Sequence, residues 1–193
     1  MKKISMDDLH SNDVYEAQRP AFRQSMIEHK KNRRVALGVN ASLHFEDYKT
    51  MHYQVQELMR SEKITRLEDI KEELAAYNPL IPDGSNLKVT FMIEFPDEDE
   101  RRKQLARLIG IEEQVLIEIA GCKPVAPIAD EDLERTTAEK TSAVHFMRYE
   151  FPPETIAAAK NGAAWTIICE HPNYRQKIQL TDSTRESLVK DFD

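Results

Sequence analysis

The sequence predicts an α+β protein in which N-terminal helices pack on a mainly antiparallel β-sheet with short intervening helices. Residues 1–82 show mostly helical spacing of apolar side chains, whereas residues 83–193 show strand-like segments. The two patterns do not alternate regularly, which favours an antiparallel sheet over a doubly wound parallel one. With 193 residues, of which 40 % are hydrophobic, the chain is long enough to bury a core, and we expect a single domain over residues 1–193.

The first helix is expected to start near Arg19, because Pro20 suits the first turn of a helix and not its interior. It ends in the basic run Lys30–Arg34, which suits the negative end of the helix dipole. From Val35 to Phe45 apolar side chains repeat with period two, as in a strand with one buried face. We expect this early strand to join the later sheet and so to make one domain.

A second helix is expected around residues 51–59, where apolar side chains recur at helical spacing. A third helix is expected from Thr65, where Glu68 completes a capping box, and it ends at residues 77–79. The later elements are expected as strands at Leu87–Phe95, Val115–Ala120, Ala143–Phe151, Trp165–Glu170 and Gln176–Leu180, with helices at Asp97–Lys103 and, through a capping box with Glu186, from Ser183. Residues 129–141 are charged and poor in large apolar side chains, which is typical of an exposed linker or mobile loop.

Composition excludes several functional classes. The chain has 27 Lys and Arg against 34 Asp and Glu, and this net charge of −7 makes nucleic acid an unlikely partner. No segment approaches the roughly 18 apolar residues of a membrane helix, and no signal peptide is visible, so a cytoplasmic location is expected. Cys122 and Cys169 are expected to be free thiols. Phosphate-loop, dinucleotide, zinc-protease and serine-hydrolase motifs are all missing from the sequence.

A basic run near the end of the first helix is one candidate site. Its members are Arg23, Lys30, Arg33 and Arg34. Guanidinium groups bind phosphate or carboxylate in a bidentate manner, so a small anionic ligand or an acidic partner is expected to dock there. The alternative is that these bases stabilise a helix C-terminus and keep the surface soluble.

A second concentration of polar residues spans residues 44–62. Imidazoles and carboxylates in one neighbourhood bind divalent metals or exchange protons, which makes His44, Glu46 and His52 candidate metal ligands. Glu57 adds a further carboxylate, and Tyr53 lies nearby in sequence. No ligand spacing here is diagnostic, and the alternative is a helix with an ordinary ion pair and surface histidines.

A third pair of groups comes from the predicted strands. His145 and Cys169 would permit Cys–His nucleophilic catalysis if the sheet brought them into contact. The alternative is a buried free cysteine and an ordinary strand-end histidine.

Three segments together resemble a known family. They are Phe22–Gly38 (FRQSMIEHKKNRRVALG), Phe45–Ile64 (FEDYKTMHYQVQELMRSEKI) and Ile70–Pro82 (IKEELAAYNPLIP). On these runs the chain resembles the bacterial family called domain of unknown function 3501, over most of its length. The resemblance implies an accessory role in redox or peroxide metabolism, with a rubrerythrin-like or iron-sulfur protein as partner. It implies no particular cofactor or reaction.

The resemblance also marks individual polar positions. Carried over residue by residue, these are Arg23, Lys30, Arg33, Arg34, Glu46, Thr50, Tyr53, Gln54, Glu57, Arg60 and Glu62. The alternative is a structural network of Arg, Glu, Gln and Tyr that braces helices against the sheet. Two functions therefore stay open: an accessory protein that binds a protein partner or a small anionic ligand, and a metal-dependent enzyme or metalloprotein that uses the cluster of residues 44–62. A homo-oligomer is compatible with either.

Overall fold

The computed structural model of the chain describes residues 2–193. The helices in this range are α1 (Asn12–Lys31), α2 (Tyr48–Ser61), α3 (Leu67–Tyr77), α4 (Glu98–Arg107), α5 (Pro153–Lys160) and α6 (Asp182–Leu188). The strands are β1 (Arg34–Ala36), β2 (Ala41–Glu46), β3 (Asn86–Ile93), β4 (Val115–Ile119), β5 (Ile128–Ala129), β6 (Val144–Glu150), β7 (Trp165–His171) and β8 (Tyr174–Gln179). Single 3₁₀ turns lie at Met6–Asp8, Asn78–Leu80, Ile111–Glu113 and Val189–Asp191.

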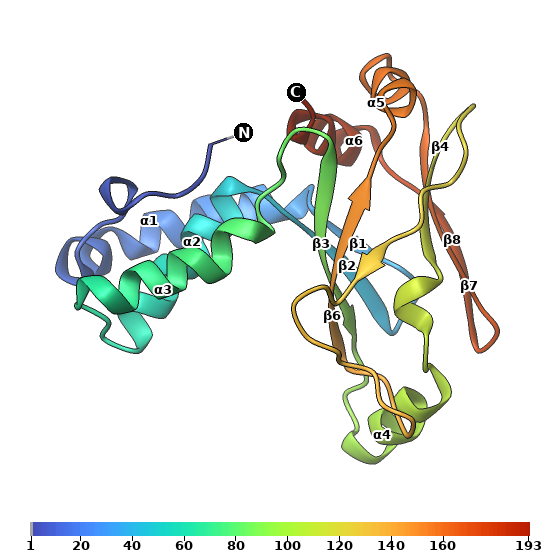
Figure 1. Cartoon of the computed structure of the whole chain (residues 1–193), viewed down its shortest axis with the longest axis horizontal. Coiled ribbons are helices and arrows are strands. Elements are labelled where there is room, and N and C mark those ends of the chain that lie inside the picture. Colours follow the sequence, from blue (N-terminus) through green and yellow to red (C-terminus); the bar gives the residue numbers. More distant parts are fainter. Residues whose placement is uncertain (1) are drawn as a thin grey trace.

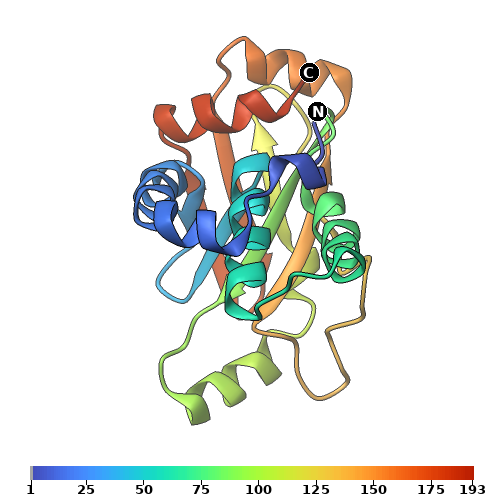
Figure 2. The same cartoon turned by 90° about the vertical axis from the view of Figure 1, so that its left-hand side faces the viewer.

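The strands form two antiparallel sheets, in the orders β1-β2-β3-β6-β5 and β4-β7-β8. Helices α1, α2 and α3 lie on one side of the five-stranded sheet, and the three-stranded sheet lies on its other side (Figure 1). Figure 2 shows the same three helices in front of the five-stranded sheet. The early strand joins the later sheet as expected, because β2 pairs with β3 from Ala41↔Ile93 to Glu46↔Lys88. The α+β class and the antiparallel pairing are confirmed.

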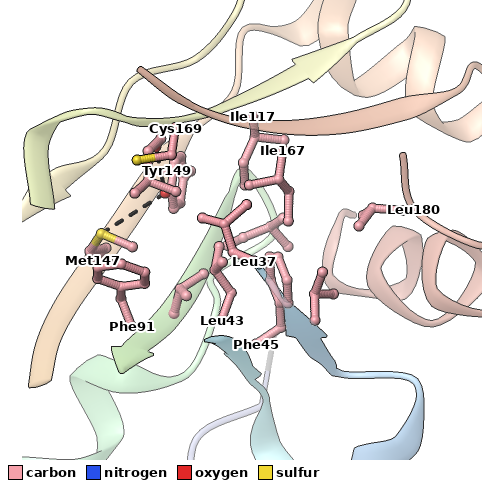
Figure 3. Close-up of a cluster of buried hydrophobic side chains, with 14 of the residues drawn as sticks. Leu37, Leu43, Phe45, Phe91, Ile117, Met147, Tyr149, Ile167, Cys169 and Leu180 are labelled. Atoms are coloured by element: carbon pink, nitrogen blue, oxygen red, sulfur yellow. Dashed lines mark hydrogen bonds between the residues drawn. The ribbon is translucent and has the colours of Figure 1, made fainter. Parts of the chain in front are cut away.

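The main core fills the space between the two sheets (Figure 3). Side chains alternate along a strand, so Leu43, Phe91 and Tyr149 share the inner face of the five-stranded sheet and are fully buried. Ile117 and Ile167 of the three-stranded sheet belong to the same cluster. The hydroxyl of Tyr149 donates a hydrogen bond to a backbone carbonyl of β4 at 2.8 Å, so its polar end is satisfied inside this core.

A second, smaller core lies among the helices. Its buried members are Ile4, Met51, Val55, Met59, Ile70, Leu74 and Ile81. Helices α2 and α3 thus bury their apolar stripes against each other. The outer face of the five-stranded sheet carries polar side chains over part of its area. A cleft separates helix α3 from this face.

The segment expected to form one strand from Val35 to Phe45 is a hairpin of β1 and β2. Gly38 lies at its turn with φ of 74°, a left-handed conformation that glycine adopts without steric cost. Val39, at the tip, is 93 % exposed although its position fits the apolar repeat. The period-two pattern was correct on both sides of the turn, but the expectation of one continuous strand was wrong.

Helix α1 begins at Asn12, well before the expected start near Arg19, and Pro20 lies inside it. A proline in a helix interior removes one backbone hydrogen bond. Tertiary contacts support the turn that precedes it, since the buried Tyr15 and the half-buried Arg19 both donate hydrogen bonds to Glu57 of α2. Packing against α2 therefore outweighs the preference of proline for the first turn.

Two expected helix caps differ from the observed ones. Helix α3 starts at Leu67 after Arg66, which makes no side-chain cap, so the capping box expected at Thr65 does not form. Helix α6 is capped by Thr181, whose hydroxyl accepts from the backbone N–H of Thr184 at 3.3 Å. A sequence pattern for a cap does not specify which of several neighbouring hydroxyls the chain uses.

Residues 130–141 contain no helix or strand and are mostly exposed, as expected for this segment. The short strand β5, which precedes them, was not predicted, because two residues carry no periodicity. Side chains nevertheless attach the segment to the rest of the fold, among them Thr136, whose hydroxyl donates to Glu112 at 2.5 Å. Among residues 2–193, no helix combines the length and the apolar character that a bilayer crossing requires.

Candidate functional site

The outer face of the five-stranded sheet carries two rows of side chains that face the helices. Because β2, β3 and β6 are paired in register, Glu46, Lys88 and Arg148 lie side by side in one row. His44, Thr90 and Phe146 form the next row. The inner positions of these strands hold the main core, so alternation leaves these polar groups on the opposite face.

Helix α3 and the 3₁₀ turn after it stand over these rows and enclose a cleft of about 600 Å³. The wall on the helix side is formed by Ala76, Tyr77 and Leu80, and Glu73 adds one carboxylate. Glu131 belongs to the segment after β5 and lines a third side. The cleft thus joins a largely apolar wall to a charged floor, which is the usual composition of a small-molecule site.

Lys88 is the cation at the centre of the floor. It is half-buried, and among residues 2–193 its ammonium group makes neither a hydrogen bond nor an ion pair. Burial lowers the pKa of Lys88, and the neighbouring positive charge of Arg148 lowers it further. The carboxylates of Glu131 and Asp83 act in the opposite direction, but neither forms an ion pair with the Lys88 ammonium, which leaves it open to an anionic group in the cleft.

Arg148, beside it, already has protein partners. Its guanidinium donates to Glu131 at 2.7 and 2.8 Å and also binds Glu150. The hydrogen bond to Glu131 raises the pKa of Arg148 despite partial burial. Arg148 therefore positions Glu131 at the rim, and it leaves Lys88 as the cation that is open to a ligand.

Two carboxylates border Lys88. Glu46 is 7 % exposed and accepts a hydrogen bond from the hydroxyl of Thr90 at 2.8 Å. Glu73, on α3, has no hydrogen bond or ion pair with any described residue. One free cation in a cleft that is also lined by Glu46, Glu73, Glu131 and Asp132 accommodates a single acid group and disfavours a ligand with several negative charges.

Two of the expected ligand-binding residues on the helices, Glu57 and Arg60, belong to a network between α1 and α2. Glu57 accepts two hydrogen bonds from Arg19, at 2.8 and 2.9 Å, and one from Tyr15 at 2.7 Å. Arg60 lies 3.4 Å from Glu16 on α1. The hydrogen bond from Arg19 lowers the pKa of Glu57. These contacts brace α1 against α2, whereas the structural alternative expected a network that braces three helices against the sheet.

The other expected residues on the helices do not extend this network into one pocket. The ammonium of Lys30 lies over the ring of Tyr53, 5.8 Å from its centroid. Arg23, Gln54 and Glu62 are exposed on the helix surface or at its end.

Arg33 lies inside the protein and is 2 % exposed. Its guanidinium binds the carboxylate of Asp191 at 2.5 Å, and it also donates to the backbone carbonyls of Phe45 and Glu46 at 2.9 and 3.1 Å. All of these partners are groups of the protein itself, so the guanidinium of Arg33 is not open to a ligand. Arg34, the next residue, is exposed and pairs with Glu94 at 3.2 Å. The basic run Arg23–Arg34 is therefore divided between the interior and the surface.

The three expected metal ligands lie in different places. His44 faces Ser42, with Nε2 3.0 Å from the hydroxyl, and Glu46 lies in the cleft. His52 places Nε2 2.7 Å from the backbone carbonyl of Asp8. His44 and Glu46 share the outer face of β2, but no group of facing ligand atoms among the described residues joins them to His52. Among the described residues, Glu112, Asp130 and His145 instead bring ligand atoms within 4.8 Å of one another.

The pairing of His145 with Cys169 is also absent from the described contacts. His145 binds Asp130 and Thr141, whereas Cys169 is buried in β7. Burial raises the pKa of the Cys169 thiol, which disfavours the nucleophilic thiolate. Both cysteines are free, as expected.

The residues that sequence reasoning missed are Lys88, Tyr77 and Phe146. One signal was available, since Lys88 occupies an outward position in a strand whose inward positions are apolar. Such a position is normally exposed to solvent. Only the packing of α3 over the sheet converts this lysine into the floor of a cleft.

The comparisons with known proteins agree with this fold. The family model described as Protein of unknown function (DUF3501) matches residues 3–192. A solved structure titled as a novel protein of unknown function from Burkholderia pseudomallei K96243 is 44 % identical, with a TM-score of 0.94 over 100 % of both chains. A search of curated proteins finds no match. Because the family model covers nearly every residue, the chain belongs to the DUF3501 family.

Proposed function

We propose that this protein binds a small ligand with one acid group and an apolar body in the cleft between α3 and the sheet. The observation that carries this proposal is Lys88, a half-buried cation without a partner among the described residues, beside an apolar wall. The proposal keeps the expected small anionic ligand and moves its site from the basic run of α1 to the sheet face.

The lining restricts the chemistry of the ligand. Tyr77 and Phe146 offer aromatic surface, and Leu80 adds an aliphatic contact. A volume of about 600 Å³ suits a compact organic molecule. Because Glu46 and Glu73 repel additional negative charge, an aromatic or aliphatic monocarboxylate fits better than a nucleotide.

An accessory role in redox metabolism, with a rubrerythrin-like or iron-sulfur protein as partner, stays a prediction that comes from the family resemblance. A monocarboxylate-binding protein is compatible with such a role. The two proposals are tested separately, since partner binding and ligand binding have different readouts.

The ligand proposal is tested by calorimetry with a panel of monocarboxylates, including benzoate, phenylacetate, indole-3-acetate and octanoate. We expect at least one of them to bind wild-type protein and Lys177→Met equally. Lys177 is a matched control because it is exposed on β8, in the other sheet. We expect Lys88→Met to weaken binding at least tenfold, which corresponds to about 1.4 kcal/mol.

Lys88→Met keeps the aliphatic stem and removes a charge that has no partner in the fold, so the variant is expected to remain folded. Equal binding by wild-type protein and Lys88→Met, or no binding of any panel member by wild-type protein, would contradict the proposal. The corresponding amides serve as a second control, because they fill the same volume without the negative charge.

A further inference from the structure

We propose that Glu112, His145 and Thr141 bind a divalent cation, with Asp130 orienting the histidine. None of these residues lines the ligand cleft, and His145 points to the opposite face of the sheet, so the site does not depend on the proposed function. His145 is fully buried at the start of β6, and Glu112 is on the 3₁₀ turn before β4. Asp130 follows β5, and Thr141 ends the irregular segment of residues 130–141.

Asp130 determines which ring nitrogen of His145 is available. The carboxylate of Asp130 lies 2.7 Å from Nδ1 of His145. An ionised carboxylate only accepts hydrogen bonds, so Nδ1 carries a proton and donates it. The neutral imidazole then has its lone pair on Nε2. A carboxylate behind a histidine in this way is the usual second shell of a histidine that ligates a metal.

Nε2 of His145 faces several oxygen atoms. It lies 2.9 Å from the hydroxyl of Thr141, 3.1 Å from the carbonyl of Ser142 and 3.9 Å from one carboxylate oxygen of Glu112. The Thr141 hydroxyl is in turn 3.2 Å from the same Glu112 oxygen. All of these atoms carry lone pairs, and Nε2 of the neutral ring carries one as well.

The cluster contains too few protons for these lone pairs. The hydroxyl of Thr136 donates to the other Glu112 oxygen at 2.5 Å, which leaves only the Thr141 hydroxyl proton to share between Nε2 and Glu112. The carbonyl of Ser142 and the carboxylate bring none. A buried group of facing acceptors is unfavourable without a positive charge among them. Either a second proton on Nε2 or a metal cation at this point supplies that charge, and the metal is the proposal tested below.

The separations suit a metal ion. Bonds of about 2.0–2.2 Å from imidazole nitrogen and carboxylate oxygen place neighbouring ligand atoms roughly 3–3.6 Å apart. The distances of 2.9, 3.2 and 3.9 Å between Nε2, the Thr141 hydroxyl and Glu112 bracket this range. One imidazole with oxygen donors and no sulfur favours Zn²⁺ or Mn²⁺ over a thiophilic ion.

The site has one side next to a cavity. This cavity of about 500 Å³ is lined by Glu112, Asp130 and Thr136, whereas His145 and Thr141 are buried behind them. Because Glu112 belongs to the 3₁₀ turn before β4, His145 to β6 and Thr141 to the irregular segment, the cation would attach residues 130–141 to both elements.

The site is tested on full-length protein that has been treated with EDTA and then titrated with ZnCl₂ or MnCl₂ by calorimetry. We expect about one ion per chain to bind wild-type protein with a measurable rise in the melting temperature. Glu112→Gln keeps the shape of the side chain, removes its charge and replaces one acceptor oxygen by an amide donor, and we expect it to abolish stoichiometric binding. Asp130→Asn is expected to weaken binding about 10- to 100-fold.

His44→Gln is the matched control, because His44 lies outside the cluster. It is expected to bind the ion as wild-type protein does. Failure of wild-type protein to bind either ion, or equal binding by Glu112→Gln, would overturn the site and assign a proton to Nε2 in place of the metal. Circular dichroism of each variant in EDTA shows that a loss of binding is not a loss of folding.

Discussion

Arg33 and Lys88 are two cations with little solvent exposure, and they differ in whether the fold supplies a partner for the charge. Arg33 is 2 % exposed, and its guanidinium is matched by Asp191 and by backbone carbonyls. Lys88 is half-buried and has no such partner among residues 2–193. A buried charge that is paired with protein groups stabilises the fold. A partly buried charge without such a pair marks a position where a ligand of opposite charge can bind.

Arg33→Met is expected to lower the free energy of unfolding by about 3–5 kcal/mol, because it leaves Asp191 buried without its partner. Urea denaturation measures the change. Arg34→Met is the control, and its loss is expected to be at most about 1 kcal/mol because its ion pair with Glu94 is exposed. The double variant Arg33→Met, Asp191→Leu is expected to recover much of the loss. An equal cost for Arg33→Met and Arg34→Met would contradict the buried role.

Glu57 makes stability depend on pH. The hydrogen bond from Arg19 holds the folded-state pKa of Glu57 below its ordinary value of 4.5. The stabilisation is therefore fully present above pH 4.5 and is lost as pH falls through the lower, folded-state pKa. We expect the difference in free energy of unfolding between wild-type protein and Glu57→Gln to shrink on acidification below pH 4.5. A difference independent of pH would show that the carboxylate charge does not brace α1 and α2.

At the scale of elements, a single turn residue shows how the hairpin is built. Gly38 has a left-handed φ, and a side chain there would place its Cβ 2.8 Å from the hydroxyl of Tyr174. That hydroxyl donates to the carbonyl of Leu37 at 2.5 Å, so it holds β8 against the hairpin. Glycine is thus required both by the backbone conformation and by the approach of β8.

Gly38→Ala is expected to destabilise the protein by more than the roughly 1–2 kcal/mol that a left-handed residue costs, since the methyl group also displaces Tyr174. Gly110→Ala is the matched control, because Gly110 has φ of 84° and no atom near the position of a Cβ. Thermal denaturation of the two variants separates the steric contribution from the backbone contribution. Similar losses in both would show that Tyr174 moves away without cost.

The helices and strands also show which features the sequence predicts and which it does not. Alternation located β3, β4, β6, β7 and β8 within one or two residues, because a strand with one buried face repeats over its whole length. Local rules were wrong at Pro20 and at Gly38, where contacts with α2 and β8 decide the conformation. The cleft could not be predicted, since Lys88 and Tyr77 meet only through the packing of α3.

The whole molecule contains two cores of unequal size. Between the sheets, the core extends over both layers, whereas a much smaller cluster holds α2 and α3 together. Local opening requires less free energy where fewer apolar side chains are packed. The helical layer is therefore the more dynamic part, and it is the layer that carries the apolar wall of the ligand cleft.

Hydrogen exchange tests this difference. We expect backbone amides of α3 to exchange faster than those of the central strands β3 and β6, which are paired on both sides. A monocarboxylate that binds the cleft is expected to slow exchange in α3 more than in β8. Uniform exchange across both layers would indicate one cooperative unit.

The buried pair of Arg33 and Asp191 has a consequence for protein synthesis. The two residues are 158 positions apart, so the partner of Arg33 leaves the ribosome long after the hairpin that carries it. At about 5–20 residues per second, the delay is on the order of 10–30 s. During that time the guanidinium of Arg33 has only Asp47 and the backbone carbonyls of Phe45 and Glu46 as partners, and it gains Asp191 only when translation has passed residue 191.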